Sequence, residues 1–186
     1  IDGQAEHVWE PLRKVDRNIR EITENARKAG VEMNRYYIVK PNVSLSMMVD
    51  CEDLLFKDLT FQNSSFWTIN FLRCHILRIE GLKVFSSLEK GINADGIDIT
   101  SCQDVIITEC TVMTGDDAIV LKSWLPEQPV ENVVVSNCVL ASSSTALKIG
   151  TETKSDVRNI VFPNCVIKDA NRGLSVVVKD GAHISQ

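Results

Sequence analysis

The most regular feature of the chain is an apolar pattern that recurs along its C-terminal two thirds. Apolar residues occupy the first, third, sixth and eighth places of five segments, residues 54–61, 77–84, 105–112, 133–140 and 160–167. The segments begin 23, 28, 28 and 27 residues apart. Alternating apolar positions at a constant long period are typical of strands that stack into a solenoid.

A shorter apolar segment follows each of these five, at residues 66–69, 96–99, 118–121, 146–149 and 173–176. The linking segments are too short and too rich in β-forming residues for leucine-rich repeats. The pattern therefore predicts an all-β fold, a right-handed parallel β-helix in which each repeat forms one coil. We expect one domain over residues 1–186, with regular coils over residues 51–180.

The six cysteines fall into two columns of equivalent positions in the repeats. One column contains Cys51, Cys74, Cys102, Val130 and Val157, and the other contains Leu59, Leu82, Cys110, Cys138 and Cys165. Because every cysteine shares its column with valine or leucine, we expect buried thiols that pack as small hydrophobes rather than disulfides or metal ligands.

A turn column precedes the strands and contains Asp53, Asp104, Asn132 and Asn159. Asp and Asn side chains cap backbone groups in turns, so we assign this column to structure.

The N-terminal segment has a different period. Apolar residues recur at intervals of three and four over residues 9–29, followed by Gly30. This spacing predicts an amphipathic helix that flanks or caps the solenoid. Binding of a partner to this helix is the alternative.

Composition narrows the classes of function. The chain has 186 residues, of which 44% are hydrophobic, enough for one domain with a core. Its net charge of −5 argues against a nucleic acid as partner, since phosphates are neutralised by clustered Lys and Arg. A run of about 18 apolar residues, as a membrane helix needs, is missing from the sequence. We expect a monomer without a membrane segment.

A candidate site lies where the repeat spacing changes. Residues 85–99 contain six extra residues, and insertions in solenoids map to loops on one face. Alignment of the short strands places four residues of consecutive coils in one column, Asp95, Asp117, Thr145 and Arg172. Adjacent strands lie about 4.8 Å apart, so Asp95, Asp117 and the neighbouring Asp116 would crowd together. Alone, residues 115–118 would predict a turn; three crowded carboxylates, whose mutual repulsion separates their pKa values, indicate acid–base chemistry.

Four segments resemble glycoside hydrolase family 28, the polygalacturonase-type pectin hydrolases: residues 1–10, 61–69, 93–99 and 115–122. The resemblance implies a right-handed parallel β-helix, a secreted or periplasmic location and inverting hydrolysis of pectic, galacturonate-containing polysaccharide. It implies no metal or other cofactor. By the family's pattern Asp116 is the general acid, while Asp95 and Asp117 position and deprotonate the attacking water.

Two family blocks are absent, which suggests a divergent or truncated member. The Gly-His-Gly block aligns with residues 144–146, and the Arg-Ile-Lys block that binds the substrate carboxylate aligns with residues 175–177. We hypothesise that Arg172 and Lys148 recognise a uronate carboxylate or sugar hydroxyls instead. The full set of expected substrate-binding residues is Asn93, Lys122, Trp124, Lys148 and Arg172.

The expected geometry of these residues is specific. Lys122 and Lys148 should point outward on the same face. Trp124 is the expected sugar-stacking residue, because it follows the strand that carries the paired aspartates, whereas Trp67 falls in an apolar slot and is assigned to the core.

Two other classes of function remain open at this point. One is a non-catalytic carbohydrate-binding or adhesin module, in which the aspartates only cap turns. The other is a polysaccharide lyase or epimerase on the same scaffold, which requires a Ca²⁺ site or a Lys or Arg base. Because members of the family are longer, we expect either a fragment or a short member.

Overall fold

Each predicted eight-residue segment turns a corner instead of running as one strand. The computed structural model describes residues 1–5, 9–11, 28, 36–38 and 43–186. In the first coil Asp58 has φ 53° and separates β4 (Glu52–Lys57) from β5 (Thr60–Gln62). Positive φ recurs at the equivalent Gly81, Glu109, Asn137 and Asn164. The left-handed conformation ends a strand, so each of the first three described coils has three strands where the apolar pattern predicted two, whereas in the last two coils the second and third strands are joined into one.

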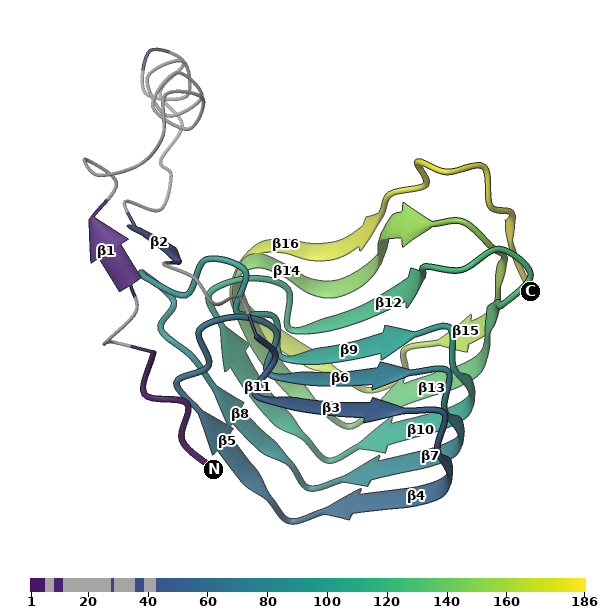
Figure 1. Ribbon diagram of the computed structural model, residues 1–186, viewed down its shortest axis with the longest axis horizontal. Helices are drawn as coiled ribbons and strands as arrows, with labels where there is room; N and C mark the ends of the chain where they lie inside the picture. The colour runs from purple at the N-terminus through teal and green to yellow at the C-terminus, as the bar shows by residue number, and fades with distance from the viewer. Residues whose placement is uncertain (6–8, 12–27, 29–35, 39–42) are drawn as a thin grey trace.

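The strands stack into a parallel β-solenoid (Figure 1). One six-stranded sheet has the order β17 (Ile184–Ser185), β15 (Val157–Val161), β13 (Val130–Ser136), β10 (Gln103–Thr108), β7 (His75–Glu80) and β4. The nine-stranded sheet includes β3 (Ser46–Val49), β6 (Ile69–Leu72), β9 (Ile97–Thr100), β12 (Ile119–Ser123), β14 (Val139–Thr153), β11 (Thr111–Thr114), β8 (Lys83–Phe85) and β5, with β16 (Val166–Val176) paired to β14. The long strands β14 and β16 continue around a corner, so this sheet covers two faces of the solenoid. The prediction of an all-β parallel solenoid is confirmed.

The core consists of columns of equivalent side chains. Ile69, Ile97, Ile119 and Leu147 lie in register on four successive strands and are buried. All six cysteines are free, four are buried, and Cys51 and Cys165 pack at the edge of the same core. The prediction that the thiols act as small hydrophobes is confirmed.

The turn column is structural, as predicted, although Asp104, Asn132 and Asn159 hydrogen-bond to one another and the expected capping of backbone groups stays a prediction. Asp53, Asp104, Asn132 and Asn159 all have φ between 55° and 58°. Asn159 Nδ2 donates to Asn132 Oδ1, and Asn132 Nδ2 donates to Asp104 Oδ1, each over 2.8 Å. This ladder links strands β10, β13 and β15 of adjacent coils, which is a structural role.

The short strands follow the predicted register in every coil except the first described one. Ile97 pairs with Ile119, Ile119 with Leu147 and Leu147 with Leu174, as expected. The partner of Ile97 on the other side is Ile69, whereas the sequence alignment had matched residues 66–69 with 96–99. The predicted register of that segment is therefore wrong by two residues. The change moves Trp67 out of the core column and into the column of Asp95.

The start of the helix predicted over residues 9–29 is a strand in the structure. Residues 9–11 form β1 (Trp9–Pro11), which pairs antiparallel with β2 (Tyr36–Ile38), instead of beginning a helix. Except for residue 28, the remainder of the predicted helix lies outside the described residues. Within the described chain, helices of the length and apolarity needed to cross a membrane are not found.

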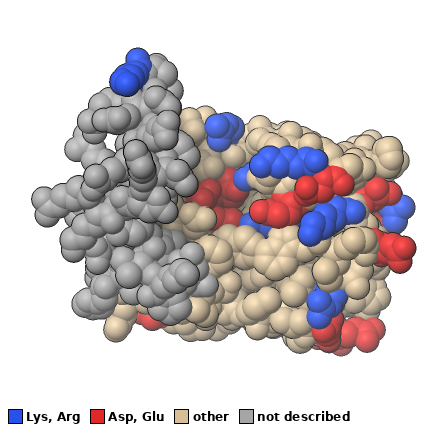
Figure 2. Space-filling model, turned by 45° about the horizontal axis from the view of Figure 1, so that its top comes forward, with Lys and Arg blue, Asp and Glu red and all other residues tan. Residues whose placement is uncertain are grey.

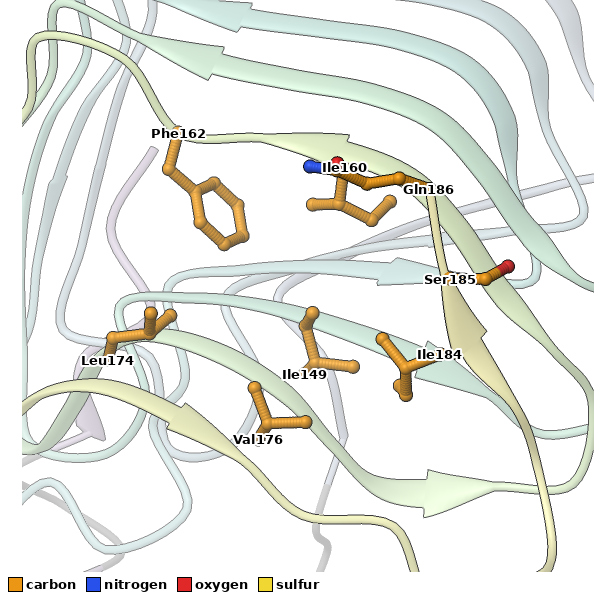
Figure 3. Close-up of a pocket in the computed structure, with 8 residues that line it drawn as sticks. All are labelled: Ile149, Ile160, Phe162, Leu174, Val176, Ile184, Ser185 and Gln186. Atoms are coloured by element: carbon orange, nitrogen blue, oxygen red, sulfur yellow. The ribbon is translucent and has the colours of Figure 1, made fainter.

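An apolar cavity lies at the C-terminal end of the solenoid (Figure 3). It has a volume of about 360 Å³ and is lined by Ile149, Ile160, Phe162, Leu174, Val176, Ile184, Ser185 and Gln186. Leu174 and Val176 on β16 are 58% and 52% exposed. These side chains occupy the positions that form the core in the preceding coils, and the cavity lining contains no carboxylate.

Candidate active site

The inserted loop packs directly on the turn that carries the paired aspartates. A Cβ atom on Gly115 would lie 2.6 Å from Gly91 Cα and 2.4 Å from Ser87 O, so only glycine fits at this contact. Gly115 N also donates to Ser86 Oγ over 3.0 Å. The loop is thereby held against residues 115–117, and its polar end reaches the carboxylates.

Backbone groups orient Asp116. Its Oδ2 accepts a hydrogen bond from Asn93 N at 3.2 Å, and its Oδ1 accepts one from Asp117 N at 2.9 Å. Burial and the neighbouring charge of Asp117 raise the pKa of Asp116, although Lys148 partly counteracts them. The turn thus holds a carboxyl group that keeps its proton to higher pH than an ordinary aspartate.

Asp95 and Asp117 lie on adjacent coils, as the alignment predicted. Gly96 N donates to Asp117 O over 2.8 Å, and Ala118 N donates to Thr145 O over 2.9 Å. Thr145 in turn pairs with Arg172. The predicted column of Asp95, Asp117, Thr145 and Arg172 therefore exists, and it brings three carboxylates of the sequence analysis together at one corner of the solenoid.

Lys148 contacts the second of the paired aspartates. Its Nζ donates to Asp117 Oδ2 over 2.6 Å, and its side chain is partly exposed. The other oxygen, Asp117 Oδ1, is buried and has no hydrogen-bond partner among the residues that the structure describes.

Lys122 holds the remaining carboxylates. Its Nζ donates to Asp95 Oδ2 over 3.0 Å and to Asp98 Oδ1 over 2.6 Å. The side chains of Lys122 and Asp95 are each 4% exposed, and that of Asp98 is 0% exposed. Lys122 leaves the core on the outer side of β12, as expected, but its ammonium is buried and already contacts two carboxylates, so it is not exposed to meet a substrate.

The pKa values of this cluster reflect burial and an imbalance of charge. Burial, followed by the charge of Asp98, raises the pKa of Asp95 well above its ordinary value, while Lys122 opposes the shift. Burial raises the pKa of Asp98 to about 6, again against the effect of Lys122. Burial alone would lower the pKa of Lys122, but Asp98 and Asp95 outweigh it and raise that pKa.

An aromatic cluster borders the carboxylates. The ring centroid of Trp67 lies 3.5 Å from Lys122 Nζ, 5.2 Å from the ring of Trp124 and 5.1 Å from the ring of Phe66. Trp67 is buried, while Trp124 and Phe66 are partly exposed. Trp124 thus lies where the sequence placed a sugar-stacking residue, and Trp67, which was assigned to the core, belongs to the site.

The other predicted contacts lie at the edge of this cluster. Asn93 and Arg172 are both exposed, at the end of the loop and on β16 respectively. In the view of Figure 2, acidic and basic side chains lie next to one another on one side of the solenoid. Tyr36 and Tyr37, further aromatic residues of the sequence, have side chains outside the described part of the structure.

Asp98 is the member of the site that sequence reasoning missed. It pairs in register with Asn70 and Val120 on the neighbouring strands, so its position in the repeat is the ordinary outward place of a strand. No signal in the sequence separated it from other polar residues at outward places of strands. Within the described ranges, groups of three or more His, Cys, Asp or Glu side chains arranged to hold a metal ion are not found.

The sequence is similar to a family of glycosyl hydrolases and to polygalacturonases. The family model described as "Glycosyl hydrolases family 28" matches residues 37–182. A polygalacturonase of Chamaecyparis obtusa is 32% identical over 121 residues, which are 65% of this chain and 20% of that protein. An exopolygalacturonase of Oenothera organensis is 27% identical over 127 residues, covering 55% of this chain and 35% of that protein.

The solved structures contain a similar fold. The crystal structure of a hyperthermoactive exopolygalacturonase from Thermotoga maritima matches with a TM-score of 0.70 and 26% identity. The match covers 90% of this chain and 40% of that chain. The chain therefore spans well under half of the length of each of these relatives.

Proposed function

Because the chain belongs to glycosyl hydrolases family 28, we propose that it contributes the catalytic coils of a secreted enzyme that hydrolyses pectic, galacturonate-containing polysaccharide with inversion. The observation that carries the proposal is that the three carboxylates differ in whether they contact an ammonium group. Asp95 and Asp117 each contact an ammonium group, at 3.0 Å and 2.6 Å. Asp116 contacts no ammonium among the described residues.

This division matches the needs of inverting hydrolysis, in which one carboxyl group gives a proton and the other carboxylates serve the water. Asp116 donates its proton to the glycosidic oxygen as the bond to the anomeric carbon breaks. Asp117 accepts a proton from the attacking water through Oδ1, the oxygen that Lys148 leaves unoccupied, and Asp95 orients the same water. The oxygen of that water forms the new bond on the opposite face of the sugar.

Substrate recognition is assigned to the exposed rim of the site. Trp124 offers an aromatic face beside the carboxylates, and Asn93 and Arg172 are exposed. Arg172 suits a uronate carboxylate, because a guanidinium group binds a carboxylate through two parallel hydrogen bonds. Lys148 lies between the rim and Asp117, where it can contact a substrate carboxylate as well as its own partner.

The experiment that tests the reaction is turnover of defined oligogalacturonates by the 186-residue chain. Inverting hydrolysis releases reducing ends, gives the inverted anomer in the first minutes by proton NMR, and forms no unsaturated product that absorbs in the ultraviolet. An ultraviolet-absorbing product would identify a lyase, and binding without turnover would identify a carbohydrate-binding module.

Two variants test the assigned roles. Asp116→Asn should lower kcat by at least about a hundredfold, the usual scale for loss of a general acid. Wild-type activity in this variant would refute the role. Arg172→Ala should raise KM for galacturonate oligomers with little change in kcat, and unchanged kinetics would remove Arg172 from the substrate site.

A further inference from the structure

Beside Asp95 lie two buried charged side chains that the catalytic scheme does not use, Lys122 and Asp98. Lys122 Nζ lies between Asp95 Oδ2 and Asp98 Oδ1 at 3.0 Å and 2.6 Å. Both carboxylates and the ammonium are almost completely removed from solvent. The second oxygen of Asp98, Oδ2, has no hydrogen-bond partner in the described part of the chain.

Such an arrangement does not favour folding. Two buried carboxylates share one ammonium, so the group carries a net negative charge when all three are ionised. Burial of charges costs several kcal/mol per ion, and a buried ion pair is often no more stable than apolar residues of similar volume. The adjacent outward position on β12 is occupied by Val120, which shows that an apolar side chain is accepted on this face.

We propose that Lys122 and Asp98 are positioning residues that fix the orientation of Asp95 and set how readily it takes up a proton. This inference rests on the proposed function, because Asp95 is the carboxylate that orients the water there. Lys122 binds only Oδ2 of Asp95, which leaves its second oxygen for the water. Asp98 competes with Asp95 for the same ammonium, so it weakens the interaction between Lys122 and the Asp95 carboxylate.

The ring of Trp67 also contacts the ammonium of Lys122. Its ring centroid lies 3.5 Å from Lys122 Nζ, a distance at which the π-face attracts the cation. In the register of the structure Trp67 belongs to the coil before Asp95, since Thr68 N donates to Asp95 O. The ring therefore covers the ammonium from the side of β6, and the exclusion of water strengthens the attraction between Lys122 and its two carboxylates.

The charges around Asp95 predict opposite effects for its two neighbours. Asp98 on its own strand, and Asp116 and Asp117 on the next coil, each raise the pKa of Asp95, whereas Lys122 lowers it. Lys148 neutralises Asp117. From β6 the nearby side chains are uncharged, with Asn70 accepting a hydrogen bond from Thr100 Oγ1 over 3.0 Å. Removing Asp98 should thus make Asp95 more acidic, and removing Lys122 should make it less acidic.

The test compares the wild type, Asp98→Asn, Lys122→Met and the double variant, with Asp104→Asn on the six-stranded sheet as a control. The pKa of Asp95 is measured through its carboxyl carbon by ¹³C NMR, assigned with Asp95→Asn. We expect the pKa to fall by about one pH unit in Asp98→Asn and to rise by at least as much in Lys122→Met, where one unit is a tenfold change in proton affinity. Asp104→Asn should leave it unchanged.

Kinetics provide the second readout. The acid limb of the kcat/KM profile should move to lower pH in Asp98→Asn and to higher pH in Lys122→Met, with kcat in Lys122→Met lowered about tenfold or more and KM little changed. The double variant has the same net charge in this group as the wild type, so it should regain stability but not kcat. Recovery of wild-type kcat in the double variant would overturn the inference.

The outcomes separate this inference from the proposed function. Opposite shifts of the Asp95 pKa in a chain that does not hydrolyse oligogalacturonates would support the positioning roles and reject the hydrolase. Shifts in the same direction, or none, would reject the positioning roles whether or not the chain is active. If Lys122→Met does not fold, the test rests on Asp98→Asn, which keeps the ammonium of Lys122. An unchanged pKa of Asp95 in Asp98→Asn would then overturn the inference.

Discussion

The solenoid has two outer faces that carry the same kinds of charged residue in different surroundings. On the six-stranded sheet, His75 Nε2 lies 2.8 Å from Asp104 Oδ2, and both side chains are 47% exposed. On the face formed by β9 and β12, Lys122 lies 2.6 Å from Asp98, and the two are 4% and 0% exposed. The contact distances are similar, so the access of water distinguishes the two faces.

The access of water determines in which direction the pKa of a paired carboxylate is shifted. On the exposed face, hydrogen bonds from Asn132 and His75 lower the pKa of Asp104, as solvated partners usually do. On the buried face, burial dominates and raises the pKa of both Asp95 and Asp98. The exposed pair of His75 and Asp104 connects the adjacent strands β7 and β10. The buried group instead places two carboxylates and one ammonium next to the proposed reaction centre, where perturbed pKa values are useful.

The largest effect should come from removal of the buried ammonium. Lys122→Met leaves Asp95 and Asp98 buried without a cation. Removing one partner of a buried ion pair lowers the free energy of unfolding by about 3–5 kcal/mol. We expect the free energy of unfolding at pH 7, measured by urea titration, to fall by this amount. A loss below about 1 kcal/mol would mean that water reaches the group and that the two faces do not differ as described.

The pH dependence of stability should show the next largest effect. Because the pKa of Asp98 is raised to about 6, the folded chain binds more protons than the unfolded chain between about pH 4 and pH 6. The free energy of unfolding should therefore fall as pH rises through this window, by roughly 2–3 kcal/mol from Asp98. Urea titrations at several pH values test this slope, which should flatten in Asp98→Asn. An equal slope in that variant would contradict the assignment.

The smallest effect should come from the exposed face. Asp104→Asn removes a charge but keeps a side chain suited to the positive φ of 55° and able to accept the hydrogen bond from Asn132. We expect a change in the free energy of unfolding of less than about 1 kcal/mol, typical of exposed pairs. Because the pKa of Asp104 is lowered, its contribution is present above pH 4 and is lost as pH falls further. A larger loss at pH 7 would show that the exposed pairs also stabilise the fold strongly.

The apolar period predicted the later coils correctly and the first one incorrectly. In the last three coils the short apolar segment begins six residues after the eight-residue segment ends, so matching Ile119 with Leu147 and Leu147 with Leu174 follows from counting residues. The first described coil differs in loop length, and there the count placed Trp67 in the core column. Hydrogen bonds between coils set the register, and they moved Trp67 beside Lys122.

The paired aspartates and Asp95 could be found in the sequence, whereas Asp98 could not be distinguished from an ordinary polar position. In a strand, every second side chain leaves the core, and alternation does not tell whether that side chain meets water. Lys122 illustrates the same limit. Its place on the outer face was predicted, but its burial between two carboxylates was not.

The amino-acid sequence by itself determined the solenoid, its core columns and the three aspartates that share one corner, because the side-chain period and the repeat length are properties of the chain that need no knowledge of distant contacts. Only the tertiary structure decided which ammonium each carboxylate holds and which charges are removed from water. Those properties depend on the distance between side chains of different coils and on the exclusion of solvent around them, and both arise only when the coils are stacked.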